Sequence, residues 1–231
     1  MGRAHQLNAS LLVAGWFALL ASTPPVFGAA GIRVVETRSL PLDRVQREQD
    51  APLELQLHLY MFWGTRWSAR QITTAVTEAT GLVGQCGVVL SRAELQVIEA
   101  PTRFRYYDTS VSRELLRRIE VSRPAVFFVE DTRNNPAFDA ETIGRGNAVG
   151  KPELTDTAWI AYDARDLPQT MAHELVHLLS NSGEHSTAPA NLMRATTSRR
   201  NTRLTAAQCA RLRSVGEANG LLVRRPSKMR K

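Results

Sequence analysis

Three histidines and one glutamate in the second half of the chain have the types and spacing of a metal-binding catalytic site. His173 and His177 are four residues apart, so on a helix both imidazoles lie on one face and can reach the same point. Glu174 lies about 100° farther round such a helix, because each turn holds about 3.6 residues. Its carboxylate can therefore reach a water molecule at the metal without being a ligand. His185 follows Gly183, which can turn the chain back to bring a third imidazole.

The chemistry expected of these residues is hydrolysis with one catalytic Zn²⁺ ion. Two or three imidazoles without thiolates, with one position left for water, form a typical catalytic zinc site. Zinc lowers the pKa of this water toward 7, and Glu174 would act as the general base that takes its proton. The pattern HExxH on a helix is typical of zinc metalloproteases. We therefore expect a zinc metallopeptidase, an endopeptidase whose substrates are peptides or proteins.

Alternatives remain for the third ligand and for the activity. Glu184 could replace His185 as the ligand. In a zinc hydrolase of another HExxH class, the third ligand would be a glutamate from a later helix, and Glu217 is the only late acid. The alternative to an enzyme is a non-catalytic, zinc-containing binding protein of the same fold. Such a protein would have no use for Glu174 as a general base. His58 is expected to be structural.

Residues 173–193 resemble the metzincin clan of zinc-dependent metallopeptidases, and the order of strands and helices before them resembles it more loosely. The resemblance implies that the three histidines bind zinc and that Met193, in a tight turn, lies beneath the metal. It also implies a cleft beside an antiparallel edge strand that pairs with the substrate. By position alone, this strand is expected at Asn147, Ala148 and Val149.

The sequence departs from the metzincin pattern HExxHxxGxxH between the second and third histidines. Ser180 stands where the pattern has glycine, and His185 follows His177 by eight residues instead of six. Residues 180–183 must therefore fold a longer connection back to the metal. No tyrosine follows Met193, so the additional tyrosine that some metzincins place near the metal is missing.

The elements that must position these residues alternate between strands and helices. Alternating leucines predict a strand over residues 53–61, and an unbroken apolar run predicts a central strand over 125–129. Further strands are expected at 94–99 and 158–162. Helices are expected from Ser68 to Gly81, over 112–120, from Asp166 with Pro168 in its first turn, and from Thr205 to near Gly220. The fold class is therefore α/β: a mixed, mostly parallel twisted sheet with crossover helices, a zinc-binding active-site helix, and a loop-rich C-terminal part ending in a helix.

Four segments are expected along the chain. Residues 1–30 read as a signal peptide, with a positive charge at Arg3, an apolar stretch over 11–21 and small residues before position 31. Residues 31–50 would form an N-terminal arm or a short propeptide, 51–222 the catalytic domain and 223–231 a basic tail. The protein is thus expected to be exported, extracellular or periplasmic, without stable membrane insertion after the signal is removed.

The two cysteines, Cys86 and Cys209, are expected to pair because the protein is exported. Closing so long a loop would contribute on the order of 4 kcal/mol by the chain-entropy model. The spacing of the cysteines is typical neither of a metal site nor of a redox motif, so we expect no catalytic role for them.

The charge of the chain is concentrated at its C-terminal end. The net charge is +7, and residues 199–231 hold ten arginines and lysines but only one acid, Glu217. This predicts a solvated basic face, with weak association of the C-terminus with anionic surfaces as the alternative. We expect no nucleic-acid partner, because the chain has no binding module for one.

Overall fold

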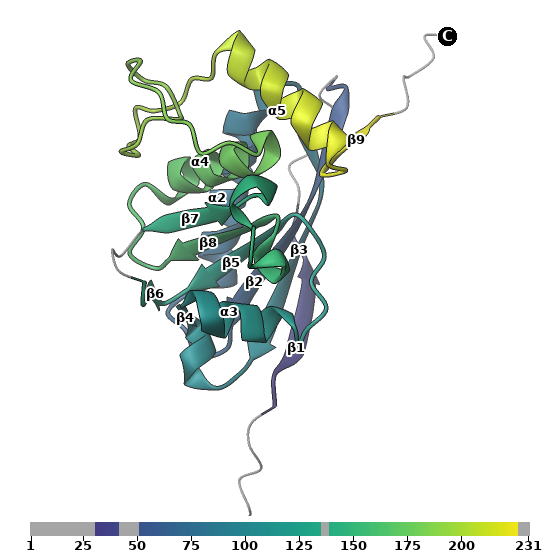
Figure 1. Cartoon of the computed structure of the whole chain (residues 1–231), viewed down its shortest axis with the longest axis vertical. Coiled ribbons are helices and arrows are strands. Elements are labelled where there is room, and N and C mark those ends of the chain that lie inside the picture. The colour runs from purple at the N-terminus through teal and green to yellow at the C-terminus, as the bar shows by residue number, and fades with distance from the viewer. Residues whose placement is uncertain (1–30, 42–50, 135–138, 226–231) are drawn as a thin grey trace, which may run out of the picture.

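A mixed seven-stranded sheet forms the centre of the molecule (Figure 1). The computed structural model describes residues 31–41, 51–134 and 139–225, so the expected signal peptide and the end of the basic tail lie outside the described residues. The strands lie side by side in the order β1 (Arg33–Ser39), β3 (Val88–Glu99), β2 (Leu53–Phe62), β5 (Ala125–Val129), β8 (Thr157–Ala161) and β7 (Ala140–Ile143). The seventh strand, β9 (Leu222–Arg224), pairs with the start of β2.

The middle of this sheet is parallel and its edges are antiparallel. Strands β3, β2, β5 and β8 run in the same direction, whereas β1, β7 and β9 run against their neighbours. The predicted α/β fold with a mostly parallel sheet is therefore confirmed. Parallel neighbours require crossover connections, which the helices α2 (Ala69–Gly84) and α3 (Thr109–Leu116) provide.

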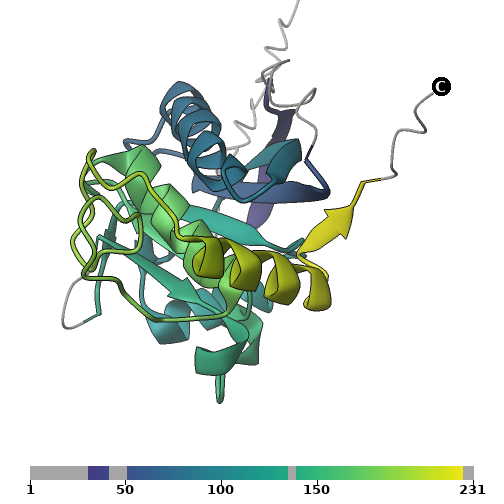
Figure 2. The ribbon, with the colours of Figure 1, turned by 90° about the horizontal axis from the view of Figure 1, so that it is seen from above.

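Helices cover both faces of the sheet (Figures 1 and 2). On one face, α2, α4 (Leu167–Ser180) and α5 (Ala206–Ala218) pack on the alternating leucines of β2, and on the other face lies α3. Strand β5 shows the two layers clearly, because Val126 and Phe128 join the first core and Phe127 joins the second. The unbroken apolar run of β5 is thus explained by burial on both faces.

Several element bounds differ from those predicted. Strand β3 begins at Val88, well before the expected start, and α2 continues past Gly81. The cap of α3 is Asp108, whose carboxylate accepts hydrogen bonds from the N–H groups of Ser110 and Val111. The additional short elements are β4 (Tyr106–Tyr107), β6 (Asp131–Thr132), η1 (Thr102–Arg105), η2 (Arg145–Asn147) and η3 (Pro152–Leu154).

The edge strand expected at Asn147, Ala148 and Val149 was wrong. Asn147 ends the 3₁₀ helix η2, and Val149, 88% exposed, lies in a turn with Gly150 at φ 77°. The antiparallel edge strand of this part of the sheet is β7, seven residues earlier, paired with β8. A short segment that ends in valine and is flanked by glycines resembles a strand in the sequence, but here it pairs with no strand of the described chain.

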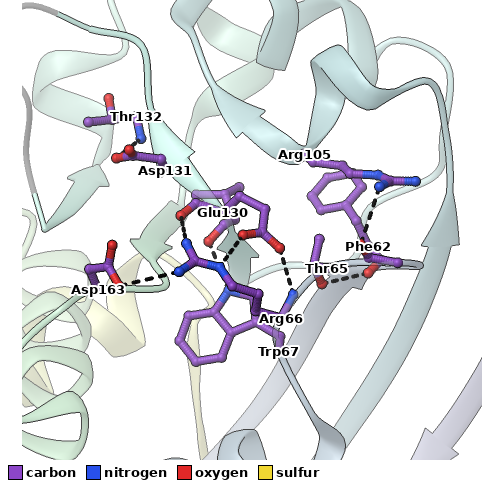
Figure 3. A network of polar contacts seen from close by, with 11 residues as sticks. Phe62, Thr65, Arg66, Trp67, Arg105, Glu130, Asp131, Thr132 and Asp163 are labelled. Carbon is purple, nitrogen blue, oxygen red and sulfur yellow. Dashed lines mark hydrogen bonds and ion pairs between the residues drawn. The ribbon is translucent and has the colours of Figure 1, made fainter.

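A polar network holds together the loops that follow β2, β5 and β8, at the carboxyl ends of these parallel strands (Figure 3). Arg66 donates from its backbone N–H and its Nε to the two carboxylate oxygens of Glu130, at 2.6 and 2.7 Å. Its guanidinium also lies 3.6 Å from Asp163, and Trp67 Nε1 donates to the Val129 carbonyl. These contacts set the entry into α2, which begins with the expected Ser68 cap.

The disulfide and the C-terminal strand close the fold. Cys86 at the end of α2 is bonded to Cys209 in the first turns of α5, as expected. Among the described helices, none is long and apolar enough to cross a membrane.

Candidate metal centre

Helix α4 carries the first two histidines through the middle of the molecule. It begins after Asp166, as predicted, and is buried from Thr170 to Ser180. The sequence suggested that the Asp166 side chain caps this helix, but it makes no capping hydrogen bond. It adopts a left-handed conformation with φ 48°, and its carboxylate accepts hydrogen bonds from Arg199 instead. The start of the helix is thus tied to the loop that follows Met193.

The three predicted histidines come together at a single point. The Nε2 atom of His173 lies 2.8 Å from that of His177, and each is 3.3 Å from the Nε2 atom of His185. Among the described residues, this is the one cluster of side chains with the arrangement of a metal site. Ligands about 2.0–2.1 Å from a tetrahedral zinc ion are about 3.3 Å apart, close to two of these three distances.

Hydrogen bonds at the other ring nitrogen orient two of the imidazoles. His173 Nδ1 donates to the Leu192 carbonyl at 2.9 Å, and His177 Nδ1 donates to the Ser182 carbonyl. Since these carbonyls only accept, the proton is assigned to Nδ1 and the lone pair to Nε2. Lone pairs that face one another at such distances need a cation between them, so the donor set fits zinc.

Burial disfavours the protonated form of the two helix histidines. It lowers the pKa of His173, and burial, together with the repulsion that a protonated His173 would exert, lowers the pKa of His177 to about 4. A histidine must be deprotonated at one nitrogen to bind a metal, so a depressed pKa favours the ligand form at neutral pH.

The turn at Asn181 explains how His185 reaches the other two histidines, although it follows His177 by eight residues instead of the six of the metzincin pattern. Helix α4 continues through Ser180, and Asn181 then takes the left-handed conformation, φ 46°, that ends it. Ser182 N–H donates back to the His177 carbonyl, and Ser186 N–H donates to the Met193 carbonyl. The longer connection thus still returns His185 to the other two histidines.

Glu174 lies beside the cluster, and a residue far away in the sequence holds it. Its side chain is almost fully buried, and its Oε2 accepts a hydrogen bond of 2.6 Å from Thr142 Oγ1 of β7. Burial raises the pKa of Glu174 to about 7. The sequence offered no signal for Thr142, because its role depends on β7 lying against α4.

Met193 lies in a tight turn, as the resemblance implied. Arg194 N–H donates to the Asn191 carbonyl, and Asn191 Oδ1 accepts from the Met193 N–H at 2.9 Å. Met193 is 3% exposed and belongs to the core shared by α2, α4 and α5. That its side chain supports the metal stays a prediction.

An open cleft of about 700 Å³ leads to the cluster and follows the edge strand β7. Its lining includes Thr142, Glu174 and the three histidines. It is also lined by Asp139, Arg165, residues 195–197, Gly144, Gly146 and Asn181. Arg165 is the single lysine or arginine among the described lining residues.

The other candidate ligands lie elsewhere. Glu184 is exposed and pairs with Arg211. Glu217, near the end of α5, pairs with Arg224 of β9. Neither belongs to the cluster, so Glu217 is not the third ligand in this structure. His58 lies in β2 and is also outside the cluster, as expected.

Comparisons with known proteins give a likeness to solved structures only. No family model and no curated protein matches the chain. The structure of metalloproteinase-II from Bacteroides fragilis is similar over 77% of this chain and 57% of that one, with 19% identity and a TM-score of 0.50. Archaemetzincin from Methanopyrus kandleri is similar over 71% of this chain and 96% of that one, with 12% identity and a TM-score of 0.47. The likeness is one of fold. The chain spans less than two thirds of metalloproteinase-II.

Proposed function

We propose that this chain is an exported zinc metallopeptidase that hydrolyses peptide bonds in peptides or proteins. The observation that carries the proposal is the meeting of three histidine Nε2 atoms beside the buried Glu174, in a cleft open to solvent. His173, His177 and His185 would hold the ion. The likeness in fold to metalloproteinase-II from Bacteroides fragilis supports this proposal.

The roles of the chain's own groups follow from their positions. Zinc held by three imidazoles supplies Lewis acidity and lowers the pKa of water toward 7. Glu174 Oε2 is held by Thr142, which leaves Oε1 to take a proton from the attacking water. The same carboxylate then gives this proton to the leaving amine. Thr142 fixes the direction of the carboxylate and is therefore a positioning residue.

Strand β7 is the proposed docking strand for the substrate. It is the last strand of the sheet on this side, so its outer backbone groups pair with no other strand of the described chain. Its residues Ala140, Glu141 and Thr142 line the cleft beside the histidines. An extended peptide can add to such an edge through main-chain hydrogen bonds, which would bring its carbonyl groups past the metal site.

The location outside the cytoplasm rests on two features. Residues 1–30 have the composition of a signal peptide, and Cys86 and Cys209 form a disulfide, which persists in oxidising compartments.

Replacing Glu174 by glutamine tests the role of the general base. E174Q should bind one zinc ion as tightly as the wild type, because Glu174 is outside the ligand cluster. Its turnover of a mixed peptide library should fall by at least about 100-fold, since general-base catalysis contributes about 10²–10⁴. Zinc content by elemental analysis and cleavage rates by mass spectrometry measure the two effects.

Replacing His185 by alanine is the matched experiment on the metal. H185A should lose zinc affinity and activity together, whereas E217A should retain both, because Glu217 is paired with Arg224. A folded, zinc-loaded wild type that cleaves no peptide, with E174Q indistinguishable from it, would establish the non-catalytic binding protein instead.

A further inference from the structure

We propose that Asn191 and Gln208, here called the amide pair, position the metal ligand His173. The inference rests on the proposed function, because it concerns the same metal centre. Neither residue lies in the cluster or lines the cleft. Asn191 belongs to the turn that the metzincin resemblance covers, but no role was predicted for its side chain, and Gln208 lies outside that stretch.

The two side chains bond to each other in both directions. Asn191 Nδ2 donates to Gln208 Oε1 at 2.9 Å, and Gln208 Nε2 donates to Asn191 Oδ1 at 3.2 Å. Backbone N–H groups of Met193 and Thr205 donate to Asn191 Oδ1 and Gln208 Oε1, respectively. Because a backbone N–H cannot accept, it must face an oxygen, so the orientation of both amides is fixed. Asn191 is 3% exposed, which makes these hydrogen bonds costly to lose.

The amide pair holds the carbonyl that orients His173. Leu192, between Asn191 and Met193, accepts the Nδ1 proton of His173 and donates its own N–H to the Arg203 carbonyl at 2.7 Å. Its backbone is thus fixed from both neighbours and from the strand-like pairing of Asn191 with Arg203. A shift of this turn would rotate the imidazole and move its Nε2 lone pair away from the metal.

Gln208 has a second role that can be separated from the first. It is the third residue of α5, where it completes a capping box with Thr205. The capping box needs only an oxygen at this side chain, and glutamate serves equally well there. The bond to Asn191 Oδ1 needs the amide Nε2, which glutamate lacks. Q208E therefore keeps the helix cap and sets two oxygens against each other at the amide pair.

The experiment measures the zinc affinity of the full mature chain by competition with a chelator at pH 8. We expect Q208E to bind zinc about 10- to 100-fold more weakly than the wild type, as found when residues supporting a metal ligand are replaced. The absorption spectrum of the Co²⁺-substituted protein should change as well, because the geometry at His173 is altered. A role in helix stability alone would leave this spectrum unchanged.

The matched control is T205A, which removes the hydroxyl cap and leaves the amide pair intact. It should lower Tm by a few degrees while keeping zinc affinity within about 2-fold of the wild type. N191A should weaken zinc binding at least as much as Q208E, but it also leaves a buried cavity, so Q208E is the deciding variant.

This design distinguishes a failure of the positioning role from a failure of the proposed function. Wild-type affinity and an unchanged Co²⁺ spectrum in Q208E would overturn the positioning role and leave the peptidase proposal standing. A wild type that binds no zinc would overturn the proposed function itself.

Discussion

Asn181 shows how one residue can serve both the fold and the site. It ends α4 at φ 46°, a conformation that asparagine tolerates better than most residues. Its Oδ1 also accepts a hydrogen bond from Gly146 N–H at 2.9 Å, and both residues line the cleft. Gly144 passes so close that a Cβ there would lie 2.9 Å from the same oxygen. The turn after α4 and the loop after β7 are therefore held together by the side-chain amide of Asn181.

Replacing Asn181 by alanine and by glycine separates these two contributions. N181A loses the hydrogen bond and adopts the left-handed conformation at a cost, so its free energy of unfolding should fall by about 2 kcal/mol. N181G keeps the conformation and loses only the bond, so about 1 kcal/mol is expected. Urea unfolding at neutral pH measures both values. An N181A variant as stable as N181G would contradict the role of the left-handed turn.

Among the single residues of the site, the sequence predicts those whose spacing matches the turn of an α-helix. His173, Glu174 and His177 are predictable because their spacing has a meaning on any helix. His185 was predicted despite its shifted position, because glycine marked a turn before it. Thr142 and Gln208 are absent from the prediction, and Asn191 was predicted only as part of the turn before Met193, since the contacts of these side chains join segments that only the tertiary structure brings together.

Among the elements, α5 depends on a glycine where it meets β9. A Cβ at Gly216 would lie 2.7 Å from Leu222 Cδ1 and 3.4 Å from the Leu179 carbonyl of α4. This close approach lets α5 pack on α4 and on the strand that follows it. Gly81 in α2 is the opposite case, with no atom within 4 Å of an added Cβ.

The same substitution at these two glycines should therefore have opposite effects. G216A should lower the free energy of unfolding by about 1–3 kcal/mol, because Leu222 must move out of a packed core. G81A should raise it by about 0.5–1 kcal/mol, because alanine is the better helix former and nothing obstructs it. Thermal and urea unfolding of both variants measure these changes. A G216A variant more stable than the wild type would show that Leu222 can move aside without cost and would contradict the prediction.

The elements that the sequence failed to predict are the antiparallel edges. Strands β7 and β9 have only four and three residues, and β1 is exposed along most of its length. Each of the three pairs with a single neighbouring strand. They lack the alternation of apolar residues from which β2 was predicted. The segment ending at Val149 was predicted as an edge strand instead, wrongly. The central strands and the amphipathic helices were predicted because burial imposes a period on them.

For the whole molecule, the disulfide ties the first crossover helix to the last helix. Cys86 and Cys209 are 123 residues apart, and Gln85 beside the bond also holds the backbone of Thr202 and Leu204. The double variant C86S/C209S should lose about 4 kcal/mol of unfolding free energy, by the chain-entropy model. Urea unfolding of the variant and of the reduced wild type should agree, and equal stability of reduced and oxidised protein would refute the expectation.

Four of the ten basic residues in the C-terminal region form ion pairs within the fold. Arg199, Arg211, Arg224 and Arg225 lie against Asp166, Glu184, Glu217 and Glu54, respectively. The excess charge that the sequence suggested is thus partly balanced by acids of the body. Association of the C-terminus with anionic surfaces stays a prediction.

The pairing of β9 with β2 has a consequence for synthesis. A chain leaves the ribosome N-terminus first, so the three histidines emerge before the Leu192 turn, α5 and β9 that complete their surroundings. Some forty further residues must follow His185, which takes about 2–8 s at about 5–20 residues per second. During that interval the nascent chain lacks the Leu192 carbonyl that orients His173, so the candidate metal centre is completed only late in synthesis.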